Sequence, residues 1–197
     1  MEGIPPTACG AVTTWCHKMD ADILVTSQPT WVYNCIAFAM GSQDMWVASA
    51  HPNGWYAWWP DDVKVPRNSH PMSLIAAFQY MGFELCEDNL PEEGFDKVVL
   101  YQIVNPNTNQ LEWTHAAKVI GEHRLHSKIG AWYDVQHRDG DVFTQCPYGE
   151  EYAYMRRPIV DRYKTQEKLP TQCEVNIGGD DWLIRFNGQK IVEMRKI

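Results

Sequence analysis

Long apolar runs are missing from this 197-residue sequence. No stretch approaches the roughly 18 consecutive apolar residues that a membrane-spanning helix needs, so we expect no integral membrane segment. The first twenty residues lack the basic start and apolar middle of a signal peptide, and we expect a protein made in the cytoplasm. Low-complexity tracts are also absent, while apolar residues make up 45% of the chain and are spread along it, which excludes disordered and fibrous classes.

Positive charge is scarce. The chain has 17 Lys and Arg against 25 Asp and Glu, which gives a net charge of −8. A protein with this balance repels phosphate backbones, and we therefore expect no nucleic-acid partner.

Cysteine pairs with metal-site spacing are missing as well. The six cysteines include no CxxC pair, and without an export signal reduced thiols are expected. Walker, GxGxxG and GxSxG motifs are absent, which argues against nucleotide binding, dinucleotide binding and serine-hydrolase chemistry. His123 and His126 form a single HxxH pair, and we expect neither a metal nor a cofactor. The remaining question is whether one thiol does chemistry.

The pattern of residues predicts an α+β protein in which helices and strands are segregated. One helix is predicted over 34–41, where Asn34 can cap the start and Gly41 can end the helix. A second is predicted over 73–81, between a proline and a glycine. Four β-rich runs then predict an antiparallel sheet: 97–104, 111–120, 124–129 and 148–157.

The tail has a separate pattern. Three short β-like runs follow Cys173, and Asn187-Gly188 between the last two is typical of a tight hairpin. We assign residues 1–165 to one domain and residues 166–197 to a C-terminal β-hairpin extension that packs on it. Loss of this tail is predicted to affect stability or delivery before chemistry.

Cys35 is the thiol best placed for chemistry, because it stands where the first predicted helix begins. The positive end of a helix and a nearby imidazole stabilise a thiolate. Groups at Asn34 and Cys35, above all the backbone N–H groups, can then hold an oxyanion. The alternative is a buried thiol that acts only as a small hydrophobe. The other five cysteines have no acid or base that we can place and are predicted to be structural: Cys9, Cys16, Cys86, Cys146 and Cys173.

His115 is the candidate base for this thiol. It lies on the predicted strand 111–120 among small residues, which leave room for a substrate or another chain. Cysteine hydrolases commonly pair their thiol with a histidine that is distant in sequence.

A third group should orient the imidazole. Ser127 lies on the adjacent strand if the chain turns at about 121–123, so local geometry favours it. Asp134 is the better acceptor by chemistry, and His137 is a further candidate. The sequence does not choose among these three residues.

The order of these motifs resembles the papain-like cysteine hydrolases, and is most similar to their NlpC-type branch. The resemblance covers about residues 31–157 and rests on four stretches: Asn34-Cys35 opening an Ala-rich helix, Thr114-His115-Ala116-Ala117 on a strand, Ser127-Lys128-Ile129-Gly130, and Asp134-Val135-Gln136-His137. Two departures are that Asn rather than Asp precedes the cysteine, and that Ser127 stands where His, Asn or Gln often follows the catalytic His.

The resemblance implies a papain-like cysteine peptidase or amidase that cleaves an amide bond in peptidoglycan peptides. Some relatives are antibacterial effector toxins that are delivered without a signal peptide, so the implied partners are a peptide or peptidoglycan substrate and an immunity or delivery protein. Two other functions stay open. One is a thiol acyltransferase or protein glutamine deamidase with the same dyad, and the other is a non-catalytic module that binds through the Trp58-Trp59 loop and the terminal hairpins.

Overall fold

A computed structural model of the chain describes residues 23–50, 56–138, 148–159, 172–177, 180–187 and 190–196. The chain divides into two compact units, Met1–Pro158 and Ile159–Ile197. The predicted boundary between 165 and 166 lies outside the described residues, and the packing of the tail on the first unit stays a prediction.

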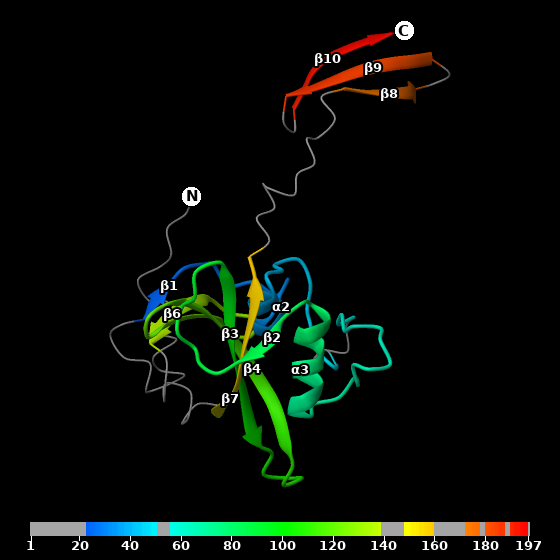
Figure 1. Cartoon of the computed structure of the whole chain (residues 1–197). Helices are drawn as coiled ribbons and strands as arrows, with labels where there is room; N and C mark the ends of the chain where they lie inside the picture. The colour runs from blue at the N-terminus through cyan, green and yellow to red at the C-terminus, as the bar shows by residue number, and fades with distance from the viewer. Residues whose placement is uncertain are drawn as a thin grey trace. The chain divides into compact units, whose positions relative to one another are not determined.

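The first unit is built on a seven-stranded antiparallel sheet (Figure 1). Its order is β1-β6-β5-β4-β3-β7-β2, so the long hairpin of β3 and β4 occupies the centre. The strands have the following bounds: β1 Leu24–Val25, β2 Glu84–Cys86, β3 Phe95–Val104, β4 Leu111–Gly121, β5 Arg124–Lys128, β6 Asp134–Arg138 and β7 Glu150–Pro158.

Helix α2 spans Cys35–Met40, which confirms the helix predicted at Cys35. The Asn34 side chain accepts a hydrogen bond from the N–H of Ala37, and Gly41 ends the helix with a φ of 93°. A residue at the helix end with this left-handed conformation is usually glycine, because a side chain there would be strained.

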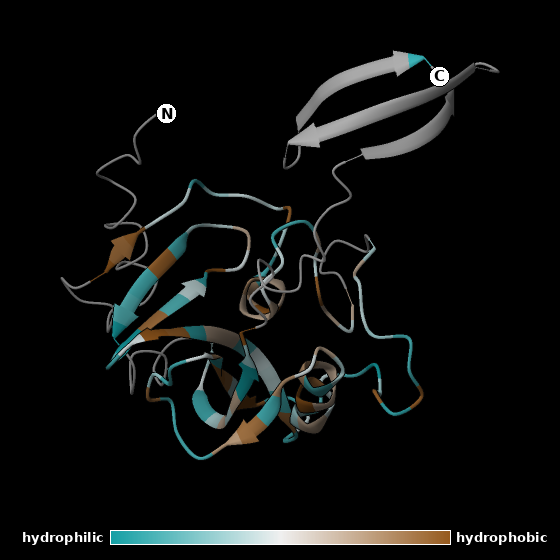
Figure 2. Cartoon of the chain, turned by 45° about the horizontal axis from the view of Figure 1, so that its top comes forward, coloured by the Kyte–Doolittle hydropathy of each residue, from teal (hydrophilic) through white to brown (hydrophobic). Residues whose placement is uncertain are grey.

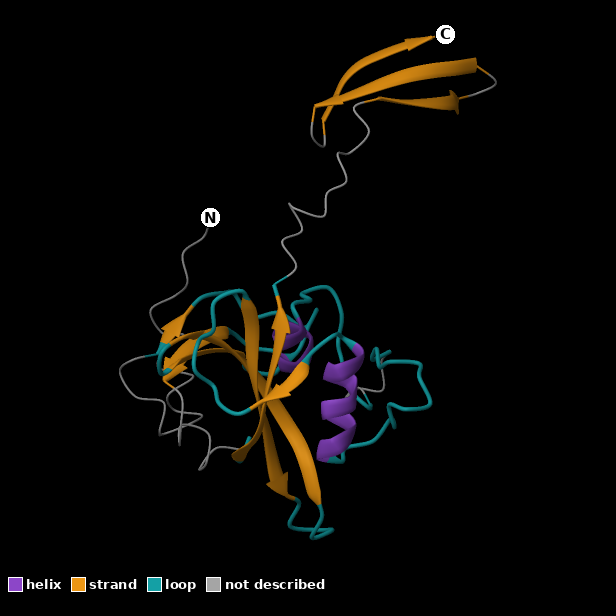
Figure 3. Ribbon diagram, viewed as in Figure 1, coloured by secondary structure: helices purple, strands orange, loops and turns teal. Residues whose placement is uncertain are grey.

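Helix α3 spans Pro71–Tyr80, slightly earlier than predicted, with proline in its first turn. Residues of both helices pack in one hydrophobic cluster with residues of β3, β4 and β7, including Ile36, Phe78, Leu100 and Ala116. Figure 3 shows these two helices beside the strands.

A second cluster contains Val99, Tyr101, Ala117, Leu125 and Val135. Val99 and Ala117 each follow directly a residue of the first cluster, and neighbouring side chains of a strand point to opposite faces. The central strands therefore bury both faces, and Figure 2 shows apolar and polar bands interleaved along the sheet.

These elements confirm the α+β class, with segregated helices and an antiparallel sheet. The run at 148–157 does return to the sheet, as β7, where it pairs with β3. The sequence did not predict β6, β1 or β2 as strands. Among the described residues, no helix combines the length and the apolar character needed to cross a membrane.

The second unit is a three-stranded antiparallel sheet of order β10-β9-β8. Its strands are β8 (Gln172–Ile177), β9 (Asp180–Asn187) and β10 (Lys190–Lys196), which confirms the three β-like runs. The predicted turn at Asn187-Gly188 extends beyond the described residues.

Candidate functional site

Cys35 is the first residue of α2, and the residue before it holds the helix start in place. Oδ1 of Asn34 accepts hydrogen bonds from the N–H of Ala37 at 3.2 Å and of Val47 at 3.1 Å. Nδ2 of Asn34 donates to the carbonyl oxygen of Val47 at 2.7 Å. The Asn34 side chain is thus a structural cap that ties α2 to the following loop. The prediction that groups at Asn34 and Cys35 hold an oxyanion stays a prediction.

The Cys35 thiol is buried, and burial raises its pKa to about 11. The backbone N–H groups of Ala116, Ile36 and Cys35 itself, and the charge of Lys128, lower the pKa but do not outweigh burial. The expectation that the helix start would yield a stabilised thiolate is therefore not met, because burial has the larger effect on the pKa. Cys35 is a neutral thiol at neutral pH and needs a base to become a nucleophile.

Three buried side chains form a line across β4, β5 and β6. Nε2 of His115 lies 3.0 Å from Oγ of Ser127, and the same oxygen lies 2.8 Å from Nε2 of His137. Nδ1 of His137 lies 2.6 Å from the carbonyl oxygen of Arg138. The strand register explains the line, because Ala117 pairs with Ser127, and Ser127 pairs with Val135. Each member is therefore a diagonal neighbour of the next on one face of the sheet.

A bulge sets the position of His115 on its strand. Tyr101 pairs with His115 and Gln102 pairs with Trp113, so Thr114 is the extra residue. The Thr114 hydroxyl donates to the carbonyl oxygen of Tyr148. Bulges of this kind re-aim the side chains beside them.

Two aromatic rings enclose His115. The Tyr148 ring stacks on the imidazole with centroids 3.9 Å apart, and Tyr101 lies at 5.5 Å with its ring tilted. Burial, and then repulsion from His137, hold the pKa of His115 well below its usual value. The lowered pKa favours the neutral imidazole.

Cys35 contacts β4 at Ala116, the residue that directly follows His115 on this strand. Ala116 packs in the same cluster as Cys35 and offers its N–H to the thiol, whereas His115 contacts Tyr101 of the second cluster. Tyr148 lies near both groups, because its ring covers His115 and its pKa is raised by burial and then by an electrostatic interaction with Cys35. By alternation the His115 side chain points to the face opposite Ala116 and α2, so the structure does not place the imidazole against the thiol, and their pairing stays a prediction.

Asp134 does not orient His115, although its chemistry suggested this role. It pairs with Lys128, one position away from the pair of Ser127 and Val135, so its side chain points to the opposite face of the sheet. There Oδ2 accepts a hydrogen bond from the Tyr33 hydroxyl at 2.7 Å. Of the three candidates left open by the sequence, Ser127 contacts His115, and His137 contacts Ser127.

Lys128 is a buried charge that the sequence analysis did not single out. Its ammonium donates to the carbonyl oxygen of Trp132 and lies 5.1 Å from the centre of the Tyr33 ring. Burial lowers its pKa to about 8, against the opposing effect of Asp134 and then Cys35. The sequence offered one signal for this position. Lys128 follows Ser127 on a predicted strand, and alternation therefore places its side chain on the opposite face, where α2 lies.

The other candidate groups have structural surroundings. His126 shares a hydrogen bond of 2.8 Å with Thr26 and packs edge-on against Phe38, whereas His123 lies exposed in the turn between β4 and β5. Within the ranges given above, no three His, Cys, Asp or Glu side chains form a group that could hold a metal ion. The free cysteines among these residues are Cys35 and the partly exposed Cys86; Cys9, Cys16 and Cys146 lie outside them, and the Cys173 side chain is not described.

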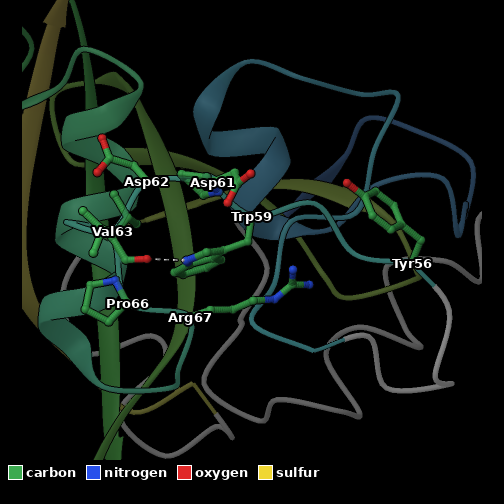
Figure 4. A pocket seen from close by; sticks show the side chains of 9 residues that line it. Tyr56, Trp59, Asp61, Asp62, Val63, Pro66 and Arg67 are labelled. Carbon is green, nitrogen blue, oxygen red and sulfur yellow. Dashed lines mark hydrogen bonds between the residues drawn. The ribbon is translucent and has the colours of Figure 1, made fainter.

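The Trp-rich loop packs on the domain. Trp59 is buried, stacks on Trp113 with centroids 5.9 Å apart, and donates from Nε1 to the carbonyl oxygen of Val65. A surface pocket of about 630 Å³ lies beside it, between Tyr56 and Arg67 (Figure 4). The Trp59 ring is thus packed within the protein, and Trp59 is also among the residues that line this pocket.

A family model described as a domain of unknown function (DUF7689) matches residues 24–156. The chain belongs to this family. The DUF7689 match begins at β1, ends within β7, and includes Cys35, His115, Ser127 and His137. It does not reach the three-stranded tail. No curated protein and no solved structure matches the chain.

Proposed function

We propose that this protein is a cysteine hydrolase that cleaves an amide bond, with Cys35 as nucleophile and His115 as base. The observation that carries the proposal is the buried line from His115 through Ser127 to His137, together with the contact of the Cys35 thiol with the N–H of Ala116, the residue next to His115. The neutral imidazole at the end of this line is in the protonation state from which a general base accepts a proton.

In the proposed reaction, Sγ of Cys35 attacks the carbonyl carbon of the amide while its proton passes to Nδ1 of His115. The resulting imidazolium gives this proton to the leaving nitrogen, the C–N bond breaks, and a thioester on Cys35 remains. Water then attacks the thioester and loses a proton to His115, which releases the acid and restores the thiol. The backbone N–H groups at the start of α2 stabilise the oxyanion in both steps.

The raised pKa of the thiol favours one of two forms of the proposed mechanism. A thiol with a pKa of about 11 holds its proton at neutral pH, so the resting site contains a neutral thiol and a neutral imidazole rather than an ion pair. Proton transfer then accompanies attack on the carbonyl. Activity is expected to fall on the acid side, where His115 becomes protonated.

The proposed fold family is the NlpC-type branch of the papain-like hydrolases, and the proposed substrate is the peptide part of peptidoglycan. The support is the order of the elements, namely a helix that begins at the cysteine, followed by an antiparallel sheet with His115 on its central hairpin. The role as an antibacterial effector with an immunity or delivery partner belongs to the same proposal.

The test uses purified protein and peptidoglycan fragments, with products read by mass spectrometry. We expect Cys35→Ala and His115→Gln to abolish cleavage while circular dichroism remains that of the wild type. Cys86→Ala is the matched control, since Cys86 is the other free cysteine described, and it should cleave normally.

Full activity in the Cys35→Ala variant would refute the site. Conversion of glutamine side chains to glutamate in a protein substrate, without cleavage of peptides, would instead indicate a deamidase. Retention of the fragments without any conversion would indicate a binding module.

A further inference from the structure

The far end of the buried line has an unambiguous donor. Nδ1 of His137 faces the carbonyl oxygen of Arg138 at 2.6 Å. A carbonyl oxygen can only accept a hydrogen bond, so the proton of this pair must reside on Nδ1 of His137. This contact fixes one proton of the line without any assumption about the other members.

The remaining protons follow from this one. In a neutral imidazole that carries its proton on Nδ1, Nε2 is an acceptor. The Ser127 hydroxyl therefore donates to Nε2 of His137, and its oxygen accepts from His115. The donor on His115 is then Nε2–H, which leaves Nδ1 as the nitrogen that can take up a proton.

The opposite direction requires a charge. Ser127 could donate to His115 only if Nε2 of His137 also carried a proton, which would make His137 an imidazolium. His137 is buried, and an imidazolium there would stand beside a second buried histidine. The cost of burying such a charge favours the neutral line.

We propose that His137 is a positioning residue that fixes the tautomer of His115 through the Ser127 hydroxyl. Without an acceptor at His137, the hydroxyl rotates and donates to Nε2 of His115, and the proton of His115 moves to Nδ1. In that tautomer Nδ1 cannot act as a base. As an account of catalysis this inference rests on the proposed function, whereas the tautomer itself can be read without any activity.

The experiment is nitrogen-15 NMR of the imidazole side chains in the full-length protein, with the His115 signals assigned by their absence from the His115→Gln variant. We expect Nε2 of His115 to show a pyrrole-type shift with an attached proton, and Nδ1 to show a pyridine-type shift. A His115 ring that carries its proton on Nδ1 in the wild type would overturn the inference.

Two substitutions at His137 test the mechanism of control. His137→Leu removes the acceptor, so a His115 signal with its proton on Nδ1 should appear. His137→Gln keeps a carbonyl oxygen that can accept from Ser127, so the wild-type tautomer should be restored. An unchanged His115 tautomer in a folded His137→Leu variant would overturn the inference. If that variant does not fold, a His115 ring with its proton on Nδ1 in His137→Gln would overturn it instead.

His126→Gln is the matched control, because His126 is a histidine of the adjacent strand β5 that contacts Thr26 and Phe38 instead of the line. It should leave the His115 signals unchanged. The two proposals fail separately. A wild-type protein with Nε2–H on His115 that cleaves nothing refutes the hydrolase, whereas Nδ1–H on His115 refutes the role of His137 even in an active enzyme.

Discussion

The hydroxyl oxygen of Ser127 lies 3.0 Å from Nε2 of His115, and both side chains are fully buried. Buried polar groups that lose a hydrogen-bond partner keep their desolvation cost. Ser127→Ala should therefore lower the free energy of unfolding by about 1–3 kcal/mol, as measured by urea denaturation. Ser42→Ala removes a serine hydroxyl that bonds to Asp44 on the surface, and should change stability by less than about 0.5 kcal/mol. Equal changes in the free energy of unfolding for the two substitutions would contradict a stabilising role of the hydrogen bonds between His115, Ser127 and His137.

The depressed pKa of His115 predicts a pH dependence of stability. Below the ordinary histidine pKa of 6.5, the unfolded chain binds a proton at His115 that the folded protein does not. Stability is therefore fully present above that pH and falls as the pH decreases through it. Denaturation curves at a series of pH values should show a shallower fall for His115→Gln than for the wild type. Identical pH slopes would show that His115 titrates normally in the folded protein.

Gly149 should not tolerate a side chain. It has a φ of +78°, and a Cβ at this residue would lie 2.1 Å from the carbonyl oxygen of Gln102. Because Gly149 follows Tyr148, the clash would also disturb the ring that covers His115. Gly149→Ala should lower the melting temperature much more than Gly94→Ala, which has a similar φ of +83° but meets no atom within 4 Å. Calorimetry of both variants measures the two melting temperatures. Equal decreases would mean that backbone strain, and not the clash with Gln102, destabilises the Gly149→Ala variant.

The Tyr33 hydroxyl should contribute to the stability of the fold and should have no effect on the tautomer of His115. Tyr33→Phe removes the 2.7 Å hydrogen bond to Asp134, and should cost about 1–3 kcal/mol in denaturant unfolding. The His115 tautomer should be unchanged, because Asp134 lies on the other face of the sheet. A changed His115 tautomer in Tyr33→Phe would return Asp134 to the list of groups that orient the imidazole.

Local signals in the sequence were sufficient for several elements. The helix at Cys35 was predicted from Asn34 and Gly41, and both act as caps in the structure. The hairpin that carries His115 was predicted from two β-rich runs around a turn. Each of these features depends on a few neighbouring residues, and such features can be recognised in a single sequence.

The third group of the site depended on register, which a single sequence does not display. Ser127 and Asp134 both lie on strands that follow His115, and alternation sends them to opposite faces. The strand Asp134–Arg138 is short and mixes polar with apolar residues, so it was not predicted as a strand. Without β6, neither the place of Asp134 nor the contact of His137 with Ser127 could be deduced.

The raised pKa of the Cys35 thiol could not be predicted from the sequence for a different reason. Helix position and a nearby imidazole both favour a thiolate, but burial by residues from distant parts of the chain has the larger effect. How deeply Cys35 is buried depends on the packing of α2 against β4, which no local pattern reports.

The most direct test of the account is the rate at which iodoacetamide modifies Cys35, measured by peptide mass spectrometry at neutral pH. Cys86 in the same molecule serves as the internal control. If His115 is the base that takes the thiol proton, Cys35 should be modified in the wild type and far more slowly in His115→Gln, while Cys86 reacts equally in both. Equal rates at Cys35 in the two proteins would contradict the pairing of Cys35 with His115.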